Sequence, residues 1–141
     1  MYTAVQTAHS IFAYVVLALL FLASINAIAG LASKRLFKDK DLRLSLFALI
    51  VTHLQLVLGI VVYFISPLGL SAFGQMSNSA LRLTSLEHPL INVIAIAFVT
   101  IGWSKHKREE SNNGKFKKIA LFYSIGFLLI LSRIPWSNWL G

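Results

Sequence analysis

The chain has 141 residues, enough for one domain over residues 1–141, and 57% of them are hydrophobic while 13% are charged. A soluble domain usually carries about 25% charged residues. Too little polar surface is left here to cover a soluble globule, so the composition predicts an integral membrane protein. The lack of cysteine excludes disulfides, thiolate nucleophiles, thiolate metal or cluster sites and covalent c-type haem attachment.

The apolar segments predict an all-α fold. The N-terminus lacks the positively charged start of a cleavable signal peptide, so the first apolar stretch, about 7–32, is expected to be a retained span. A helical span needs about 20 mostly apolar residues, and 42–65, 86–103 and 118–134 also qualify. No strand-like alternation competes with them. We therefore expect a membrane four-helix bundle with up-down-up-down topology, in which glycines within the spans allow close helix approach. These are Gly30, Gly59, Gly102 and Gly126.

The charges of the connecting loops predict the orientation. Residues 33–43 and 104–118 hold 11 of the 13 Lys and Arg, whereas 66–85 holds only Arg82. The positive-inside rule places the two basic loops in the cytoplasm and both termini on the outer, periplasmic side. The net charge of +8 then needs no nucleic-acid partner, because basic loops beside a lipid bilayer account for it. The apolar 66–85 loop is expected to lie over the outer surface as a lid.

Polar residues inside the spans are the candidates for function, because they are costly in lipid. They are His9, Asn26, His53, Gln55, Glu87, His88, Asn92 and Arg133. With a rise of about 1.5 Å per residue, His53 is expected near the midplane, and His9, Glu87, His88 and Arg133 in the outer half. His53 and Gln55 lie about 200° apart around their helix, so one of them is expected to serve packing only. His106, among cytoplasmic charges, is expected to be solvated.

Most of these residues also have a purely structural interpretation. Thr84-x-x-Glu87 matches a capping box, and Pro89 suits the first turn of a helix. His53 could bond to a neighbouring helix, and His9 could lie idle in the interface. Arg133 could be an interfacial anchor in an aromatic belt with Trp136 and Trp139, or it could bind a carboxylate. None of these explains His88.

Histidines on separate helices of an apolar bundle favour haem b over other cofactors. Haem needs one or two axial imidazole nitrogens, an apolar slot and a polar end for its propionates. His9, His53 and His88 are the candidate ligands, and Arg133 and Arg82 the candidate propionate partners. We expect His88 to be one axial ligand. The second is His9 or His53, with His9 favoured because it belongs to the same outer layer.

The segments HLQLVLGIVVYFISPLGL, NSALRLTSLEHPLINVIAI and KIALFYSIGFLLILSRIPW resemble a family of small four-span bacterial membrane proteins labelled "cytochrome b". The resemblance implies haem b binding and electron transfer in the bacterial inner membrane, with a quinone or a redox protein as partner. The layout is also similar to half of a haem A synthase and to membrane protoporphyrinogen oxidases. In those oxidases a first-span histidine, matched by His9, is functional. A functional lysine of their third span has no counterpart here.

Two alternatives to a cytochrome stay open at this stage. One is an enzyme of haem synthesis that oxidises protoporphyrinogen. The other is a cofactor-free interaction or assembly subunit, in which the histidines bond only to neighbouring helices.

Overall fold

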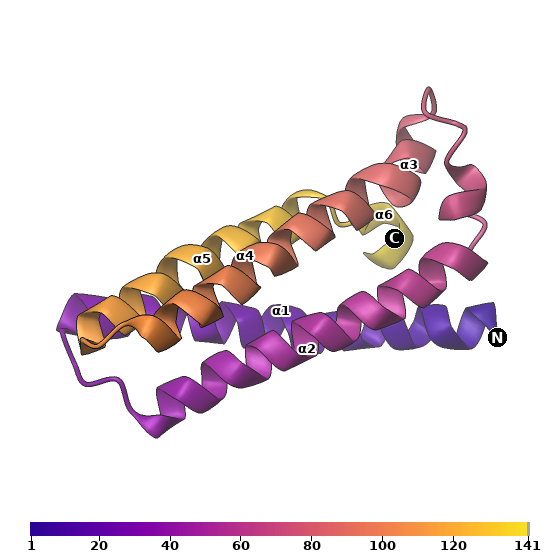
Figure 1. Ribbon diagram of the computed structural model, residues 1–141. Helices are drawn as coiled ribbons and strands as arrows, with labels where there is room; N and C mark the ends of the chain where they lie inside the picture. Colours follow the sequence, from indigo (N-terminus) through magenta and orange to yellow (C-terminus); the bar gives the residue numbers. More distant parts are fainter. Residues whose placement is uncertain (141) are drawn as a thin grey trace.

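A computed structural model describes residues 1–140, and over that range the chain is all-helical, without strands. Four long helices make up most of it: α1 (Tyr2–Ser33), α2 (Asp39–Ile65), α4 (His88–Arg108) and α5 (Asn112–Ser132). They lie along one another, with α1 in contact with α2 and α5, and α4 in contact with α5 and α2 (Figure 1). The prediction of an all-helical fold is confirmed.

Three helical segments are long and apolar enough to cross a membrane: α1, α2 and the run Ser79–Arg108. The prediction of a membrane protein with transmembrane helices is supported by them. α5 is not among the three, although a fourth span was predicted over 118–134. Its first turns carry Lys115, Lys117 and Lys118 and the helix ends at Ser132, so its apolar part falls short of the roughly 20 residues that a span needs.

The segment between α2 and α4 is more ordered than a loop. It contains the short helices η1 (Leu70–Ala72), α3 (Ser79–Arg82) and η2 (Leu83–Glu87), and the last two continue directly into α4. Asn78 caps this helical run, since its side chain accepts hydrogen bonds from the amides of Ala80 and Leu81. The predicted capping box at Thr84 is therefore wrong. The Thr84 hydroxyl instead bonds to carbonyls of the preceding turn.

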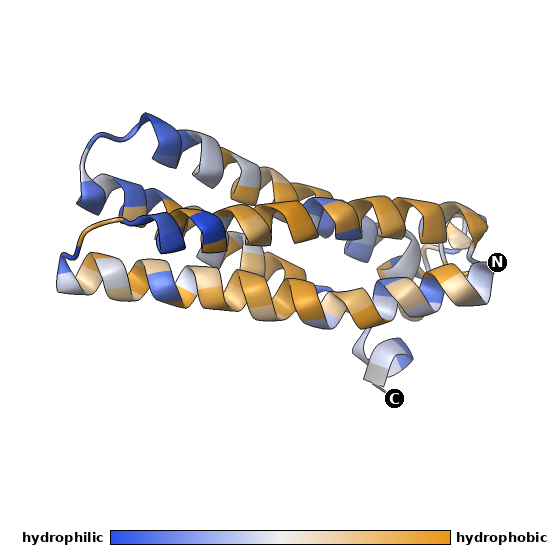
Figure 2. Ribbon diagram, turned by 90° about the horizontal axis from the view of Figure 1, so that it is seen from below, coloured by the Kyte–Doolittle hydropathy of each residue, from blue (hydrophilic) through white to orange (hydrophobic). Residues whose placement is uncertain are grey.

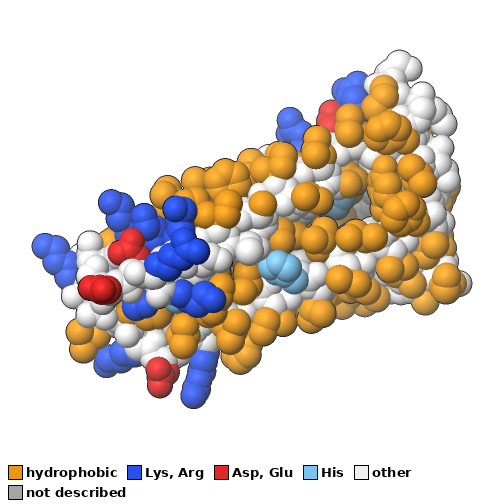
Figure 3. All heavy atoms as spheres, in the orientation of Figure 1, with side chains coloured by type: hydrophobic (Ala, Val, Ile, Leu, Met, Phe, Trp, Pro, Cys, Tyr) orange, Lys and Arg blue, Asp and Glu red, His pale blue; other side chains and the backbone are white. Residues whose placement is uncertain are grey.

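The two ends of the molecule differ in charge. The α1–α2 and α4–α5 connections lie at one end, where Figure 2 shows hydrophilic residues and Figure 3 gathers Lys and Arg. Both termini and the α2–α4 connection lie at the other end (Figure 1). After α5 the chain turns into the short helix α6 (Trp136–Leu140). We call these the basic end and the terminal end.

The hydrophobic core occupies the half of the molecule nearer the basic end. Small residues let the helices approach there: Ala23, Ala27, Ala48 and Ala95 are all at most 1% exposed. A Cβ added at Gly126 of α5 would lie 2.8 Å from Val99 Cγ2 of α4. Cβ atoms at Gly30 and Gly102 would likewise collide with phenylalanine side chains of α5, so the predicted close approach at glycines is confirmed.

The buried charged group in this half has partners. The Arg35 guanidinium donates to both carboxylate oxygens of Asp41, which is 1% exposed, and to the side-chain carbonyl of Asn26. The Asn26 amide donates to Asp41 at 2.8 Å, so each of Arg35, Asp41 and Asn26 is bonded to the other two. These hydrogen bonds with Asp41 raise the pKa of Arg35. A charge-assisted network thus joins α1, the loop and α2.

His106 contradicts its expected solvated position, because only 1% of it is exposed. Its ring packs against Trp103 and Phe37, with ring centres 4.6 Å and 5.5 Å apart, and Nδ1 bonds to the Trp103 carbonyl at 2.7 Å. The loop residue Phe37 folds back over α4 and covers the imidazole. A histidine between lysines is therefore part of the packed end of the core.

Candidate functional site

A cavity of about 500 Å³ lies in the half of the molecule nearer the terminal end. Its size falls within the range of small-molecule and cofactor sites. Apolar side chains of α1, α2 and α4 form most of its wall, and residues of α6 and of the α2–α4 connection close one end. The polar residues that reach it include Tyr2, Gln6, His9, Gln55, His88 and Asn92.

A π-helical turn sets the position of His88. Pro89 has no amide hydrogen to donate to the Ser85 carbonyl four residues earlier, and its ring crowds that carbonyl. The helix widens at this point, and the His88 amide bonds to Leu83, five residues back. The Tyr63 hydroxyl of α2 donates a hydrogen bond to this Ser85 carbonyl at 3.0 Å. Such π-turns often occur at functional sites.

The His88 ring contacts one backbone carbonyl and one side-chain amide. Its Nδ1 lies 2.9 Å from the carbonyl oxygen of Arg133, the residue that follows α5, and 3.2 Å from the amide nitrogen of Asn92, which donates to the His88 carbonyl at 2.6 Å. A carbonyl can only accept, so Nδ1 carries the proton, and the lone pair of the neutral ring is on Nε2. Histidines that bind metals usually donate their other ring N–H to a carbonyl or carboxylate in this way.

His9 of α1 is placed beside α2 by a glycine. A Cβ at position 59 would lie 3.2 Å from His9 Cε1, so Gly59 provides the space for the imidazole. The Gln55 amide donates to the backbone carbonyl of His9 at 2.8 Å and joins the two helices. Within the described residues, His9 Nδ1 and Gln55 Oε1 are buried and have no hydrogen-bond partner. Buried polar atoms of this kind call for an explanation, and an absent ligand is one.

The His9 and His88 rings meet across the cavity. Their centres are 6.4 Å apart and their planes are nearly perpendicular, at 81°. They do not make a three-ligand site, because no group of three or more His, Asp and Glu side chains suited to a metal ion occurs within residues 1–140. Two imidazoles in an apolar cavity can instead bind a metal cofactor. Such a cofactor takes two nitrogen ligands from the protein, and its own macrocycle supplies the other ligands of the metal.

His53 is not part of this arrangement. It is exposed on the apolar surface and does not line the cavity. Its Nδ1 lies 2.8 Å from the Leu49 carbonyl, and its Nε2 lies 3.3 Å from the Thr100 hydroxyl of α4. Gln55, two residues along, does line the cavity. The two side chains therefore point to different faces of α2, as the sequence predicts.

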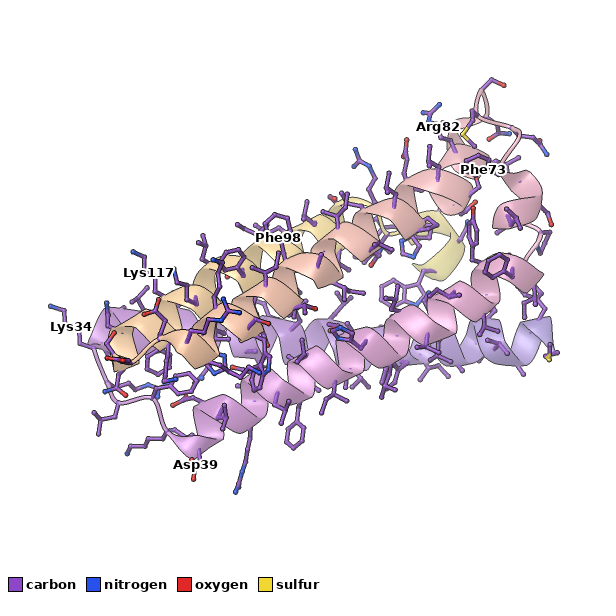
Figure 4. The ribbon with its side chains drawn as sticks, in the orientation of Figure 1. Lys34, Asp39, Phe73, Arg82, Phe98 and Lys117 are labelled. Atoms are coloured by element: carbon purple, nitrogen blue, oxygen red, sulfur yellow. The ribbon has the colours of Figure 1, made fainter. Side chains whose placement is uncertain are left out.

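The two predicted arginines meet a carboxylate outside the cavity. Arg82 Nε bonds to Glu87 at 3.0 Å, and Arg133 Nε lies 3.7 Å from the other oxygen of the same group. Neither arginine lines the cavity. Figure 4 labels Arg82 at the terminal end beside Phe73, far from Lys34 and Lys117 at the basic end. Glu87 thus serves as their shared partner rather than as a helix cap.

Trp139 was predicted to belong to an aromatic belt, and it lines the cavity. Its indole N–H donates to the Ser10 carbonyl at 3.2 Å, and its ring lies 4.7 Å from that of Tyr14. α6 is thereby fastened to α1, one residue from His9. Tyr63 also lines the cavity and was not predicted as a site residue. The sequence feature that could have indicated it is Pro89, which leaves the Ser85 carbonyl without an amide donor.

Comparison with models of protein families, with curated proteins and with solved structures gave no match to this chain. The resemblance to four-span cytochrome b proteins stays a prediction.

Proposed function

We propose that this protein is a four-helix membrane bundle that binds one haem b between His9 and His88 and carries single electrons in the bacterial inner membrane. The partners would be a membrane quinol or cytochrome and an acceptor on the outer side. The observation that carries the proposal is the pair of imidazoles whose ring centres are 6.4 Å apart in a cavity of about 500 Å³.

The topology follows from charge and contacts. The basic end holds the two Lys- and Arg-rich connections, which the positive-inside rule assigns to the cytoplasm. Both termini and the cavity then face outward. α5 packs against α4 and α1, and its basic first turns can extend to the cytoplasmic interface by snorkelling. On this basis we propose α5 as the fourth span of an up-down-up-down bundle.

The residues fit the chemistry of haem. His9 and His88, whose ring centres are 6.4 Å apart, would hold the haem iron through their imidazole nitrogens. His88 has its Nδ1 proton bonded to the Arg133 carbonyl and its Nε2 free. His9 has a buried ring nitrogen without a partner. The surrounding aliphatic side chains suit a large apolar macrocycle.

Haem b, when bound, would supply one-electron chemistry. The chain itself would bind and orient it. Arg133, through its carbonyl, fixes the tautomer of His88, and Gly59 leaves the room in which the His9 ring lies. Polar side chains that line the cavity include Tyr2, Gln6 and Asn138, and these would support the propionates better than Arg82 and Arg133, which do not line it and are paired with Glu87.

The test is the absorption spectrum of the protein purified after expression with ample haem. We expect a Soret band with the sharp visible bands of a six-coordinate bis-histidine haem. His9→Ala and His88→Ala should each lose that signature, since one ligand cannot hold the iron six-coordinate. His53→Ala is the matched control, because His53 lies outside the cavity, and it should keep the spectrum.

Other outcomes would overturn the proposal. A protein without a Soret band would favour the cofactor-free subunit. A spectrum lost with His53→Ala and kept with His9→Ala would contradict the ligand pair. Consumption of added protoporphyrinogen by the haem-loaded protein would favour the enzyme alternative.

A further inference from the structure

The cavity is covered on the side that faces the termini. The Trp139 indole is bonded to Ser10, and the Ser66 hydroxyl of the α2–α4 connection lies 3.3 Å from the Tyr2 hydroxyl. Ser66, Leu68, Pro135 and Trp139 all line this end. A ligand arriving from the aqueous phase on this side would have to displace both α6 and the connection.

The side between α2 and α4 is more open. α2 and α4 pack against each other less extensively than the other three neighbouring pairs of long helices do. One hydrogen bond joins α2 to α4, between His53 and Thr100, and another joins Tyr63 of α2 to the Ser85 carbonyl of η2, the turn that leads into α4. His53 and Tyr63 are ten residues apart on α2, which corresponds to about 15 Å along the helix. Figure 3 shows the surface hollowed between these two helices.

The residues between these two bonds belong to both the cavity and the exterior. Ile60 of α2 and Val93 of α4 line the cavity, yet they are 47% and 52% exposed. Both lie in the segments long and apolar enough to span the membrane. In a bilayer, their exposed faces would contact hydrocarbon. We call this opening, flanked by Ile60 and Val93, the lateral portal.

We propose that the cavity is filled from the bilayer through the lateral portal, so that haem b reaches His9 and His88 sideways from the lipid. This rests on the proposed function for the identity of the occupant. Haem is a planar, largely apolar molecule, so it can pass from hydrocarbon through an apolar portal without exposing its macrocycle to water. Tyr63 and Ser85 bound the portal toward the terminal end, where the propionates can stay near the interface.

The test uses the lack of cysteine in the chain, which makes any introduced thiol unique. Ile60→Cys protein, haem-free and in liposomes, is treated with a bulky aromatic thiosulfonate or with its methyl counterpart. Haem dissolved in donor liposomes is then added, and the growth of the Soret band is followed. We expect the bulky label to slow uptake by about tenfold or more, the methyl label to have little effect, and a reductant to restore the rate.

Val57→Cys is the matched control. Val57 lies three residues earlier on the same helix and is 58% exposed, but it does not line the cavity. Val93→Cys and Leu90→Cys form the corresponding pair on α4, since Leu90 is 54% exposed and outside the cavity lining. The bulky label should slow uptake only at positions 60 and 93.

The outcomes separate the two proposals. Equal uptake with and without the bulky label at both portal positions would overturn lateral entry while leaving haem binding intact. Equal slowing at positions 57 and 60 would also overturn it, because the label would then act on the bilayer rather than on the portal. Failure of the unlabelled protein to take up haem would overturn both proposals.

Discussion

The two halves of this molecule handle polar groups in opposite ways. Near the basic end, Asp41, Arg35 and Asn26 satisfy one another, and the buried Tyr123 hydroxyl donates to the Ser45 carbonyl at 2.8 Å. Near the terminal end, His9 Nδ1 and Gln55 Oε1 face a cavity without partners. The polar groups near the basic end thus hold the helices together, whereas two of those that line the cavity leave their hydrogen-bonding capacity unused.

Packing follows the same division. Alanines and glycines at the helix contacts of the basic half let the backbones approach, and Leu20 and Phe116 fill what is left. In the other half the α1–α2 pair separates from the α4–α5 pair, as Figure 1 shows, and α6 enters between them. Empty space in a protein interior loses van der Waals contacts. The closely packed half supplies the stability that keeps the cavity half in place.

The largest expected effect is the loss of the ion pair at the basic end. Arg35→Met leaves the Asp41 carboxylate, 1% exposed, with only the Asn26 amide and the Lys38 amide as donors. Breaking a buried pair by removing one partner costs about 3–5 kcal/mol. We expect a loss near the lower figure, about 3 kcal/mol, because these two donors remain. Unfolding of the purified protein in detergent by sodium dodecyl sulfate titration measures it.

The double variant Arg35→Met with Asp41→Leu is the control for that experiment. With the carboxylate gone, no uncompensated charge is buried, so much of the lost free energy of unfolding should return. If the double variant is less stable than Arg35→Met alone, the pair is not the source of the effect.

A second comparison makes the same substitution in each half of α1. Ala23 is 1% exposed in the core, whereas Ala13 lines the cavity. Ala23→Leu should destabilise the protein by about 1–3 kcal/mol, because overpacking forces the helices apart. Ala13→Leu should instead stabilise it by about 1 kcal/mol, because the added methyl groups fill space. Thermal unfolding in detergent distinguishes the two, and equal losses at both positions would contradict a real cavity.

Hydropathy and the helix-ending residues in the sequence were enough to predict the four long helices, but not the short ones. The end of α2 at Ile65 was predicted because Ser66-Pro67 stops a helix. The start of α1 at Tyr2, rather than near residue 7, was not, because the first turns carry polar residues with no apolar pattern. The predicted start of the α3–α4 run was wrong, because Thr84 and Glu87 have the spacing of a capping box without acting as one. Asn78 is the residue whose side chain bonds to the free amides.

The site was only partly accessible to sequence reasoning. Depth along each helix grouped His9 with His88 in the outer half, although counting about 1.5 Å per residue from the nearest loop lysine places His9 about 12 Å further out than His88. The observed ring distance of 6.4 Å depends on helix tilt, which depth counting ignores. Rotation about the helix axis was inaccessible too, since α2 is apolar on every side. His53 therefore could not be assigned outward, nor could the two arginines be assigned to Glu87.

The smallest expected effect tests the π-turn that positions His88. Tyr63→Phe removes the donor to the Ser85 carbonyl, which Pro89 leaves without an amide, and should cost about 1 kcal/mol. In a Pro89→Ala background the new amide can donate to Ser85, so Tyr63→Phe should cost much less. Unfolding of the four proteins completes a double-mutant cycle. Equal costs of Tyr63→Phe in both backgrounds would show that Pro89 does not create the vacancy that Tyr63 fills.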